Sequence, residues 1–172
     1  MKYFKTKTRR STRQRGAVIV ETALTIIPLF SFIFATLDIS MAVTMQNTLQ
    51  FAARQGVRYA VTSQTLTAGT GHDASIKSVV VANTMGMMPF LIPSGGNSDP
   101  DSYITITYYN PSTLALVTGA NSNRGGNICK VTISGLRYSW MGPLTRDSAA
   151  LNLSSSSSDV MEASPNGQPP AR

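Results

Sequence analysis

The sequence predicts an α+β protein in which a long N-terminal hydrophobic helix carries a small head with a short helix and an antiparallel sheet. A nearly uncharged apolar stretch over residues 17–37 is followed by helical periodicity to about residue 61. Strand-like alternation and turn residues occupy much of the second half of the chain. With 172 residues, 42% of them hydrophobic, there is room for one ordinary domain beside the helix.

The charge of the chain is concentrated at its N-terminus. The formal net charge is +7, and seven Lys and Arg residues precede Gly16, whereas the first acidic residue is Glu21. Beyond Gly16, eight basic residues balance eight acidic ones. A nucleic-acid site needs basic side chains spread over a folded surface, and here the excess belongs to a leader at residues 1–16. We therefore expect no nucleic-acid partner.

The stretch over residues 17–37 is long enough to cross a membrane. A helix of that length is about 31 Å long, close to the thickness of the hydrocarbon core. Basic residues precede the stretch and Asp38 follows it. By the positive-inside rule, we expect a single pass through a membrane, with a cytoplasmic N-terminus and an exported head.

Three interpretations of this segment remain open: a permanent anchor, a secretory signal, and a helix whose leader is trimmed. Residues 40–42 (Ser-Met-Ala) offer a signal-type cleavage site before Val43. The carboxylate of Glu21 costs about 2.5 to 3.5 kcal/mol at the bilayer centre, unless it reaches toward the interface or finds a partner. Cleavage between Gly16 and Ala17 creates an α-amino group that can pair with Glu21 of a neighbouring subunit.

Two segments carry a family resemblance. Residues 15–29 read RGAVIVETALTIIPL, with a glycine after basic residues, a glutamate five positions later and an apolar-Pro-Leu sequence. Residues 52–60 read AARQGVRYA. Together they resemble the N-terminal signature of TadE-like proteins, minor pseudopilins of the tight-adherence (Flp, type IVc) branch of type IV pili. The resemblance implies that a prepilin peptidase cuts after Gly16.

The resemblance also implies a function in pilus assembly. The mature helix stays anchored or enters an extracellular pilus, and the protein supports adherence or secretion through helix packing. The implied partners are the prepilin peptidase, the major pilin, sister pseudopilins and the inner-membrane assembly platform. Pro28 lacks an amide hydrogen, so we expect a kink or a loosened turn there. The alternative is an unprocessed, membrane-anchored scaffold or surface-binding protein.

The composition argues against an enzyme. The chain has one histidine, His72, one cysteine, Cys129, and two glutamates. The methionines at residues 85–88 have no neighbouring His or Cys, so we expect them to fill the core rather than bind a metal. We expect no catalytic residues, no cofactor, no metal and no small-molecule substrate. Cys129 is expected to be a buried hydrophobe, and an exposed thiol that links two subunits is the alternative.

We expect four parts along the chain. They are the basic leader at 1–16, the TadE-like helix at 17–61, the exported α+β head at 62–153 and a flexible Ser/Pro-rich tail at 154–172. The outer part of the helix carries an apolar stripe that suits packing on the head or on neighbouring subunits: Met41, Met45, Leu49, Ala52, Ala53, Gly56 and Ala60.

Within the head, we expect His72 in a loop, a short helix and three strands, and a weak last strand from Ser148 onward. The predicted helix covers residues 74–87, and the strands cover 103–109, 114–118 and 128–136, the last extending toward Trp140. The Gly- and Asn-rich residues 119–127 suit a hairpin turn between two antiparallel strands.

Overall fold

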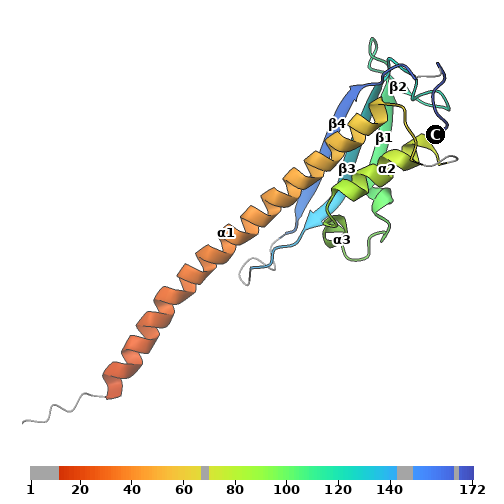
Figure 1. Cartoon of the computed structure of the whole chain (residues 1–172). Helices are drawn as coiled ribbons and strands as arrows, with labels where there is room; N and C mark the ends of the chain where they lie inside the picture. The colour runs from red at the N-terminus through yellow and green to blue at the C-terminus, as the bar shows by residue number, and fades with distance from the viewer. Residues whose placement is uncertain (1–11, 67–69, 143–148, 165–166) are drawn as a thin grey trace, which may run out of the picture.

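A computed structural model describes residues 12–66, 70–142, 149–164 and 167–172, with side chains from Gly16 onward. It has a long helix with a small head packed along its C-terminal half (Figure 1). Most of the predicted leader lies outside the described residues. The elements are the helices α1 (Thr12–Val61), α2 (His72–Asn83) and α3 (Met88–Leu91), the 3-10 helix η1 (Pro100–Tyr103), and the strands β1 (Ile104–Tyr109), β2 (Leu116–Val117), β3 (Ile128–Tyr138) and β4 (Leu151–Val160).

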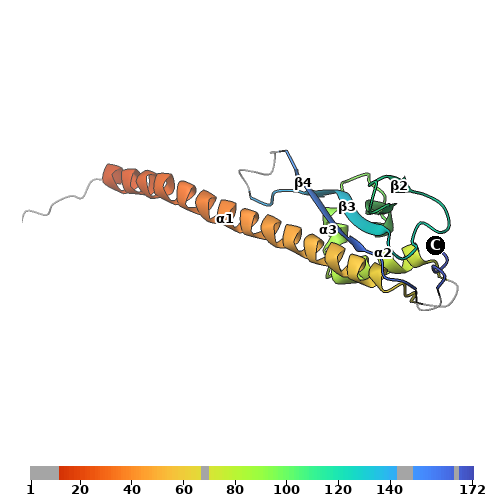
Figure 2. The same ribbon diagram turned by 90° about the horizontal axis from the view of Figure 1, so that it is seen from above.

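The sheet is antiparallel and has the strand order β2-β1-β3-β4. Helices α1 and α2 lie side by side on one side of it, and the turned view shows this layering (Figure 2). The predicted α+β class is therefore confirmed. The core lies between these two layers, and Tyr108, Val131, Ile133 and Leu136 are among its buried members from the sheet.

The serine run at residues 154–158 lies in a strand, whereas the sequence predicted a flexible tail from residue 154. It forms the middle of β4, where Ser155 to Ser158 pair with Ile133 to Lys130 of β3. Backbone hydrogen bonds to a neighbouring strand do not depend on the side chain, so a run without apolar alternation can still complete a sheet. The small side chain of Ser155 is buried.

The predicted hairpin turn at residues 119–127 was wrong. These residues connect β2 with β3, but β1 lies between those two strands in the sheet. The hairpin joins β1 to β2 instead, where the side chain of Asn110 accepts hydrogen bonds from the backbone N–H groups of Ser112 and Thr113. Short loops with Gly and Asn suit many turns, and strand order depends on contacts that sequence spacing does not contain.

The predicted short helix ends earlier than expected. Helix α2 stops at Asn83, because Met85 adopts a positive φ of 53° that a helix does not tolerate. The methionines after it then separate: Met85 is exposed, whereas Met88 at the start of α3 is fully buried. Only part of the predicted methionine core is therefore realised.

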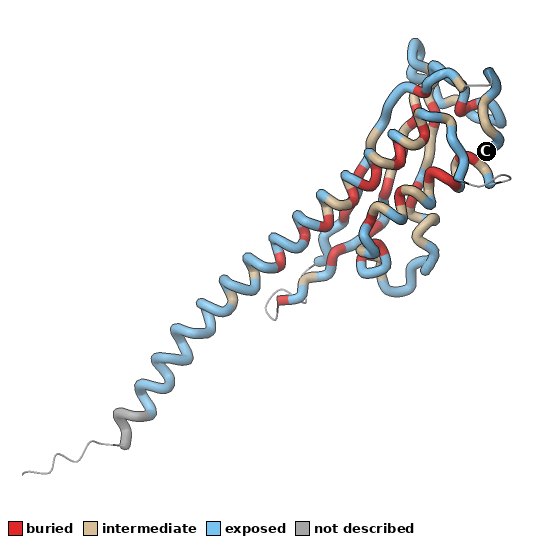
Figure 3. Tube along the Cα trace, in the orientation of Figure 1, coloured by how far each residue is buried: buried red, intermediate tan, exposed pale blue. Residues whose placement is uncertain are grey.

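Helix α1 is divided into two halves by its surroundings. Residues 16–37, here called the exposed half, contain no buried side chain, and residues 38–61, the packed half, bury one stripe against the head (Figure 3). The stripe confirms most of the predicted positions, but Met41 is 41% exposed and Ala42 takes its place. The buried positions are Asp38, Ala42, Met45, Leu49, Ala52, Ala53, Gly56, Val57 and Ala60.

Small residues on this stripe let α2 and the sheet approach α1 closely. A Cβ atom added to Gly56 would lie 2.3 Å from Cγ2 of Val80 in α2 and 3.7 Å from Cγ1 of Val131 in β3. The two helices can therefore keep their separation only while residue 56 has no side chain.

We expect Gly56→Ala to destabilise the head by about 1–3 kcal/mol, because Val80 must move to accept the new methyl group. The measurement is thermal unfolding of the detergent-solubilised chain followed by circular dichroism. Gly16→Ala is the matched control, because an added Cβ there meets no described atom within 4 Å. Equal melting temperatures for Gly56→Ala and the unaltered chain would contradict the close packing of α1 on α2.

Candidate functional site: the exposed half of helix α1 and its junction with the head

The exposed half of α1 presents large apolar side chains on all its sides. Leu24 and Phe32 are each 74% exposed, and Leu37 at its end is 60% exposed. Among the described residues, α1 is the helix long and apolar enough to cross a membrane. An apolar surface of this extent is not stable in water, so it needs lipid or other helices around it. The exposed half is thus compatible with a single-pass membrane anchor.

The hydroxyl side chains of the exposed half are hydrogen-bonded within the helix. The hydroxyl groups of Thr22, Thr25, Ser31 and Thr36 each donate to the carbonyl oxygen four residues earlier, over 2.6–2.9 Å. In a bilayer, an unsatisfied hydroxyl would carry a free-energy penalty that these bonds avoid. These residues therefore do not oppose burial of the helix in lipid.

The four residues singled out from the sequence all lie on this half. Gly16 and Ala17 are exposed and lie within the helix, which begins at Thr12 and runs on through Pro28. The side chain of Glu21 is exposed and makes no hydrogen bond or ion pair with another described residue. Gly16, Ala17 and Glu21 lie near one end of the molecule, about 60–70 Å along the helix from Val61.

The junction between the halves is built around Asp38, a buried acid. Its carboxylate accepts hydrogen bonds from the Tyr138 hydroxyl at 3.1 Å and from the backbone N–H groups of Met141 at 3.0 Å and Gly142 at 2.8 Å. Burial and the negative charge of Asp38 raise the pKa of Tyr138, so its hydroxyl stays a donor. The residues that follow β3 are thereby fixed against α1.

Sequence analysis gave Asp38 a different role, as a charge that follows the membrane span. The signal for its buried role was its position, since Asp38 lies four residues before Ala42 on the same helical stripe. An acid in line with apolar core positions indicates a partner on the packed element. That partner lies 100 residues away in the sequence, at Tyr138, and no local pattern identifies it.

A second polar cluster lies at the opposite end of the head. The Arg172 guanidinium lies 2.6 Å from the Asp73 carboxylate in an ion pair and 4.9 Å from the centre of the Tyr108 ring. The hydroxyl of Tyr108 donates to Asp73 at 2.8 Å. This cluster attaches residues near the C-terminus to α2 and β1.

His72 and Cys129 are both buried next to this cluster, and neither is placed for catalysis. His72 is the first residue of α2 rather than a loop residue, and its burial lowers its pKa. Burial, reinforced by the nearby charge of Asp73, raises the pKa of Cys129 to about 12. A protonated and buried thiol is a poor nucleophile, and it cannot cross-link two subunits, so the alternative of an exposed cysteine was wrong.

The residues that the structure describes contain no group of three or more His, Cys, Asp or Glu side chains able to hold a metal ion. What they do contain is an α+β head on a helix that can cross a membrane. The chain is therefore of the class of proteins with a single N-terminal apolar helix and a folded head.

Comparison with known proteins gives a family match for the N-terminal helix. Residues 16–58 match the family model of TadE-like proteins. This match confirms the resemblance found in the sequence for the N-terminal helix and supports a TadE-like protein of the Tad (Flp) pilus system. No curated protein and no solved structure matches the chain. The matched segment holds the exposed half, Asp38 and Gly56, and it ends within the packed half.

We expect Asp38→Ala to loosen the junction, because the Tyr138 hydroxyl and two backbone N–H groups lose their acceptor. Each buried group left unsatisfied costs about 1–3 kcal/mol. Asp159→Ala is the control, since Asp159 is exposed on β4. Hydrogen exchange measured by mass spectrometry should rise at residues 138–142 in Asp38→Ala and stay unchanged in Asp159→Ala. Unchanged protection in both variants would show that Asp38 does not hold this segment.

Proposed function

We propose that the chain is a pilus assembly protein, a minor pseudopilin that is trimmed after Gly16 and then assembled by packing of its exposed half. The observation that carries this proposal is the exposed half itself. It is apolar on all sides, yet it contains one carboxylate, Glu21, that has no cation among the described residues. A surface of this kind suits a bundle of helices in which a neighbour supplies the missing charge.

The surroundings of Gly16 support processing at this position. Glycine within a helix destabilises it by about 0.5–1 kcal/mol relative to alanine. At Gly56, close packing explains the glycine, but at Gly16 an added Cβ would meet no described atom within 4 Å. The fold of the head therefore gives no reason for a glycine here, whereas recognition by a peptidase does.

The position of Glu21 supports pairing between subunits. After cleavage, Ala17 becomes the first residue and its α-amino group lies one helical turn before Glu21. A charged amine and a carboxylate are each costly in an apolar bundle, and together they offset much of that cost. The four-residue step from Ala17 to Glu21 is about 6 Å along the helix axis, so a neighbour displaced by about one turn brings its amine to the depth of Glu21.

The proposed setting is the inner (cytoplasmic) membrane, with the N-terminus in the cytoplasm and the head exported. The proposed partners are a prepilin peptidase, the major pilin, sister pseudopilins and the inner-membrane assembly platform. The seven basic residues before Gly16 support this orientation, because basic residues are retained on the cytoplasmic side. In this setting the protein supports adherence or secretion.

One observation favours the alternative of an unprocessed anchor or scaffold. Helix α1 begins at Thr12, so the Gly16–Ala17 bond lies inside a helix. A peptidase must unwind this turn before it can cut the bond. The glycine lowers the free energy needed for that unwinding, which keeps processing the better supported function.

We expect the protein from native membranes to begin at Ala17, as measured by intact mass and N-terminal sequencing. Gly16→Val should leave the head folded, because an added Cβ at residue 16 meets no described atom within 4 Å. This variant should retain Met1 as its first residue. If the unaltered protein itself begins at Met1, the result supports the unprocessed anchored scaffold rather than the pseudopilin. A chain beginning at Val43 would instead identify a secretory signal.

We expect Glu21→Gln to reduce incorporation into sheared pili severely, because the amide cannot neutralise a neighbour's α-amino group. Glu162→Gln is the matched control, since Glu162 is the other glutamate of the chain and is exposed on the head. Immunoblots of sheared pili and of membranes measure both variants. Normal pili with Glu21→Gln, at equal levels of the membrane protein, would disprove the pairing.

A further inference from the structure

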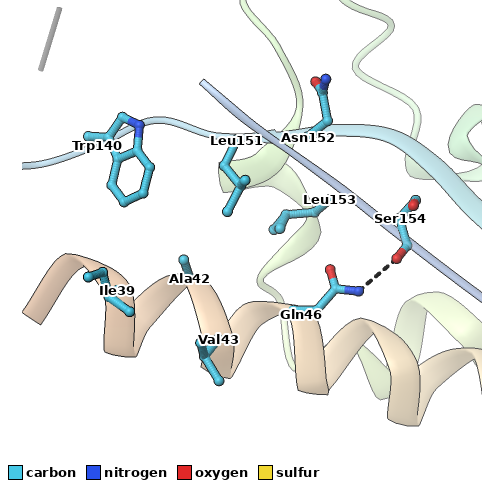
Figure 4. Close-up of a pocket in the computed structure, with 9 residues that line it drawn as sticks. All are labelled: Ile39, Ala42, Val43, Gln46, Trp140, Leu151, Asn152, Leu153 and Ser154. Carbon is cyan, nitrogen blue, oxygen red and sulfur yellow. Dashed lines mark hydrogen bonds between the residues drawn. The ribbon is translucent and has the colours of Figure 1, made fainter. Parts of the chain in front are cut away.

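Two apolar hollows flank α1 at its junction with the head. The first, of about 340 Å³, opens between α1 and the start of β4, and Figure 4 shows Ala42 of the helix pointing toward Leu151 across it. Ile39 and Val43 of α1 and Trp140 also line it. The second, of about 470 Å³, lies between α1 and the segment after β3. Its apolar lining comes from Phe34, Leu37, Met41, Tyr138 and Met141.

The level of these hollows along the helix is set by Asp38. Its hydrogen bonds to Tyr138, Met141 and Gly142 hold the segment after β3 beside that turn of α1. The apolar stretch of residues 17–37 ends one residue earlier, and at about 31 Å it matches the hydrocarbon core. The hollows therefore lie where a bilayer spanned by this helix meets water on the head side.

The side chains at this level have the chemistry of a membrane interface. Met141 is 65% exposed and Leu151 is 41% exposed, and the half-buried Trp140 stacks edge-on against Tyr138 with ring centres 5.7 Å apart. Tryptophan and tyrosine concentrate at this depth in membrane proteins, because one side of the ring is apolar and the other carries a polar group. Among the described residues that line the two hollows, Asp38 is the one charged residue, and its carboxylate accepts three hydrogen bonds.

We propose that this junction rim, formed by Trp140, Met141 and Leu151, rests in the head-side leaflet of the membrane, and that phospholipid acyl chains fill the two hollows. The inference rests on the membrane-anchored state that the proposed function assumes. The hollows are continuous with the lipid-facing helix, because Phe34 and Leu37 belong both to the apolar span and to the lining. The lining offers apolar contact without a free charge, which suits acyl chains and gives a protein partner little to recognise.

A head seated in this way has a fixed orientation on the membrane. If helix α1 were the sole attachment, the head could tilt relative to the bilayer plane. Contact of the junction rim with the lipid adds a second attachment beside α1, so the head resists tilting. The polar cluster of Asp73, Tyr108 and Arg172 then faces away from the membrane, since it lies at the far end of α1 and the sheet. The rim must leave the lipid when a subunit is extracted from the membrane for assembly.

The chain's own tryptophan tests the proposal, because Trp140 is the one tryptophan of the sequence. The full chain is placed in nanodiscs of phosphatidylcholine that hold one copy each, and quenching of Trp140 fluorescence is measured. We expect strong quenching by phospholipids spin-labelled near the headgroup end of the acyl chain. Weaker quenching is expected from a label near the terminal methyl group, and little from aqueous iodide.

In the matched control, the tryptophan is moved from the junction rim to the hairpin loop between β1 and β2. In the double variant Trp140→Phe and Leu114→Trp, the new tryptophan replaces a side chain that is 67% exposed in the hairpin loop. It should be quenched several-fold more by iodide than Trp140 and hardly at all by the labelled lipids. Met141→Glu, which adds a charge at the rim, should shift Trp140 toward iodide quenching without changing the circular dichroism of the head.

Three results would overturn the proposal. The first is quenching of Trp140 by iodide and not by the labelled lipids, in chains that float with the membrane. This result would show that the rim is exposed to water although the chain is anchored. Protection of Trp140 that arises only with several copies per disc would assign the hollows to a neighbouring subunit. Chains that fail to float with lipid would contradict the anchored state itself, and with it the proposed function.

Discussion

The carboxylate of Asp38 is the contact on which the arrangement of helix and head depends. It lies at the point where α1 changes from an all-round apolar surface to a helix with one buried stripe. By accepting hydrogen bonds from Tyr138 and from two backbone N–H groups, it fixes the far end of β3 to this turn. A buried carboxylate tolerates few other arrangements, because each donor that it loses leaves a costly unsatisfied charge.

The rest of the packed half depends on small side chains. Ala52, Ala53, Gly56 and Ala60 form a smooth strip on which α2 and β3 lie closely, and the larger Leu49 fills the space nearer the junction. Helix α1 therefore has two functions, one for each half. One side holds the head, while the exposed half keeps its whole circumference for lipid or neighbouring helices.

Several features of this structure were predictable from local patterns. The length of α1, most of its buried stripe and the strands β1 and β3 follow from the periods of apolar residues, which repeat in sequence at the spacing of the element itself. Strand β4 was only weakly indicated by the sequence, because its serines carry no such period and its place depends on pairing with β3. The same holds for the place of β1 between β2 and β3, which residues 119–127 do not encode locally.

The sequence by itself determined the membrane-length helix, the clustering of basic charge before Gly16, the isolated Glu21 and the TadE-like signature. Each of these is a property of nearby residues in the sequence, and none depends on how the head folds. Only the tertiary structure decided that Asp38 is a buried acceptor, that Cys129 is shielded and that Trp140 stands beside the end of the apolar span. The contact between Asp38 and Tyr138 joins residues 100 positions apart. Such contacts form through packing and hydrogen bonding across the fold rather than through neighbouring residues in the chain.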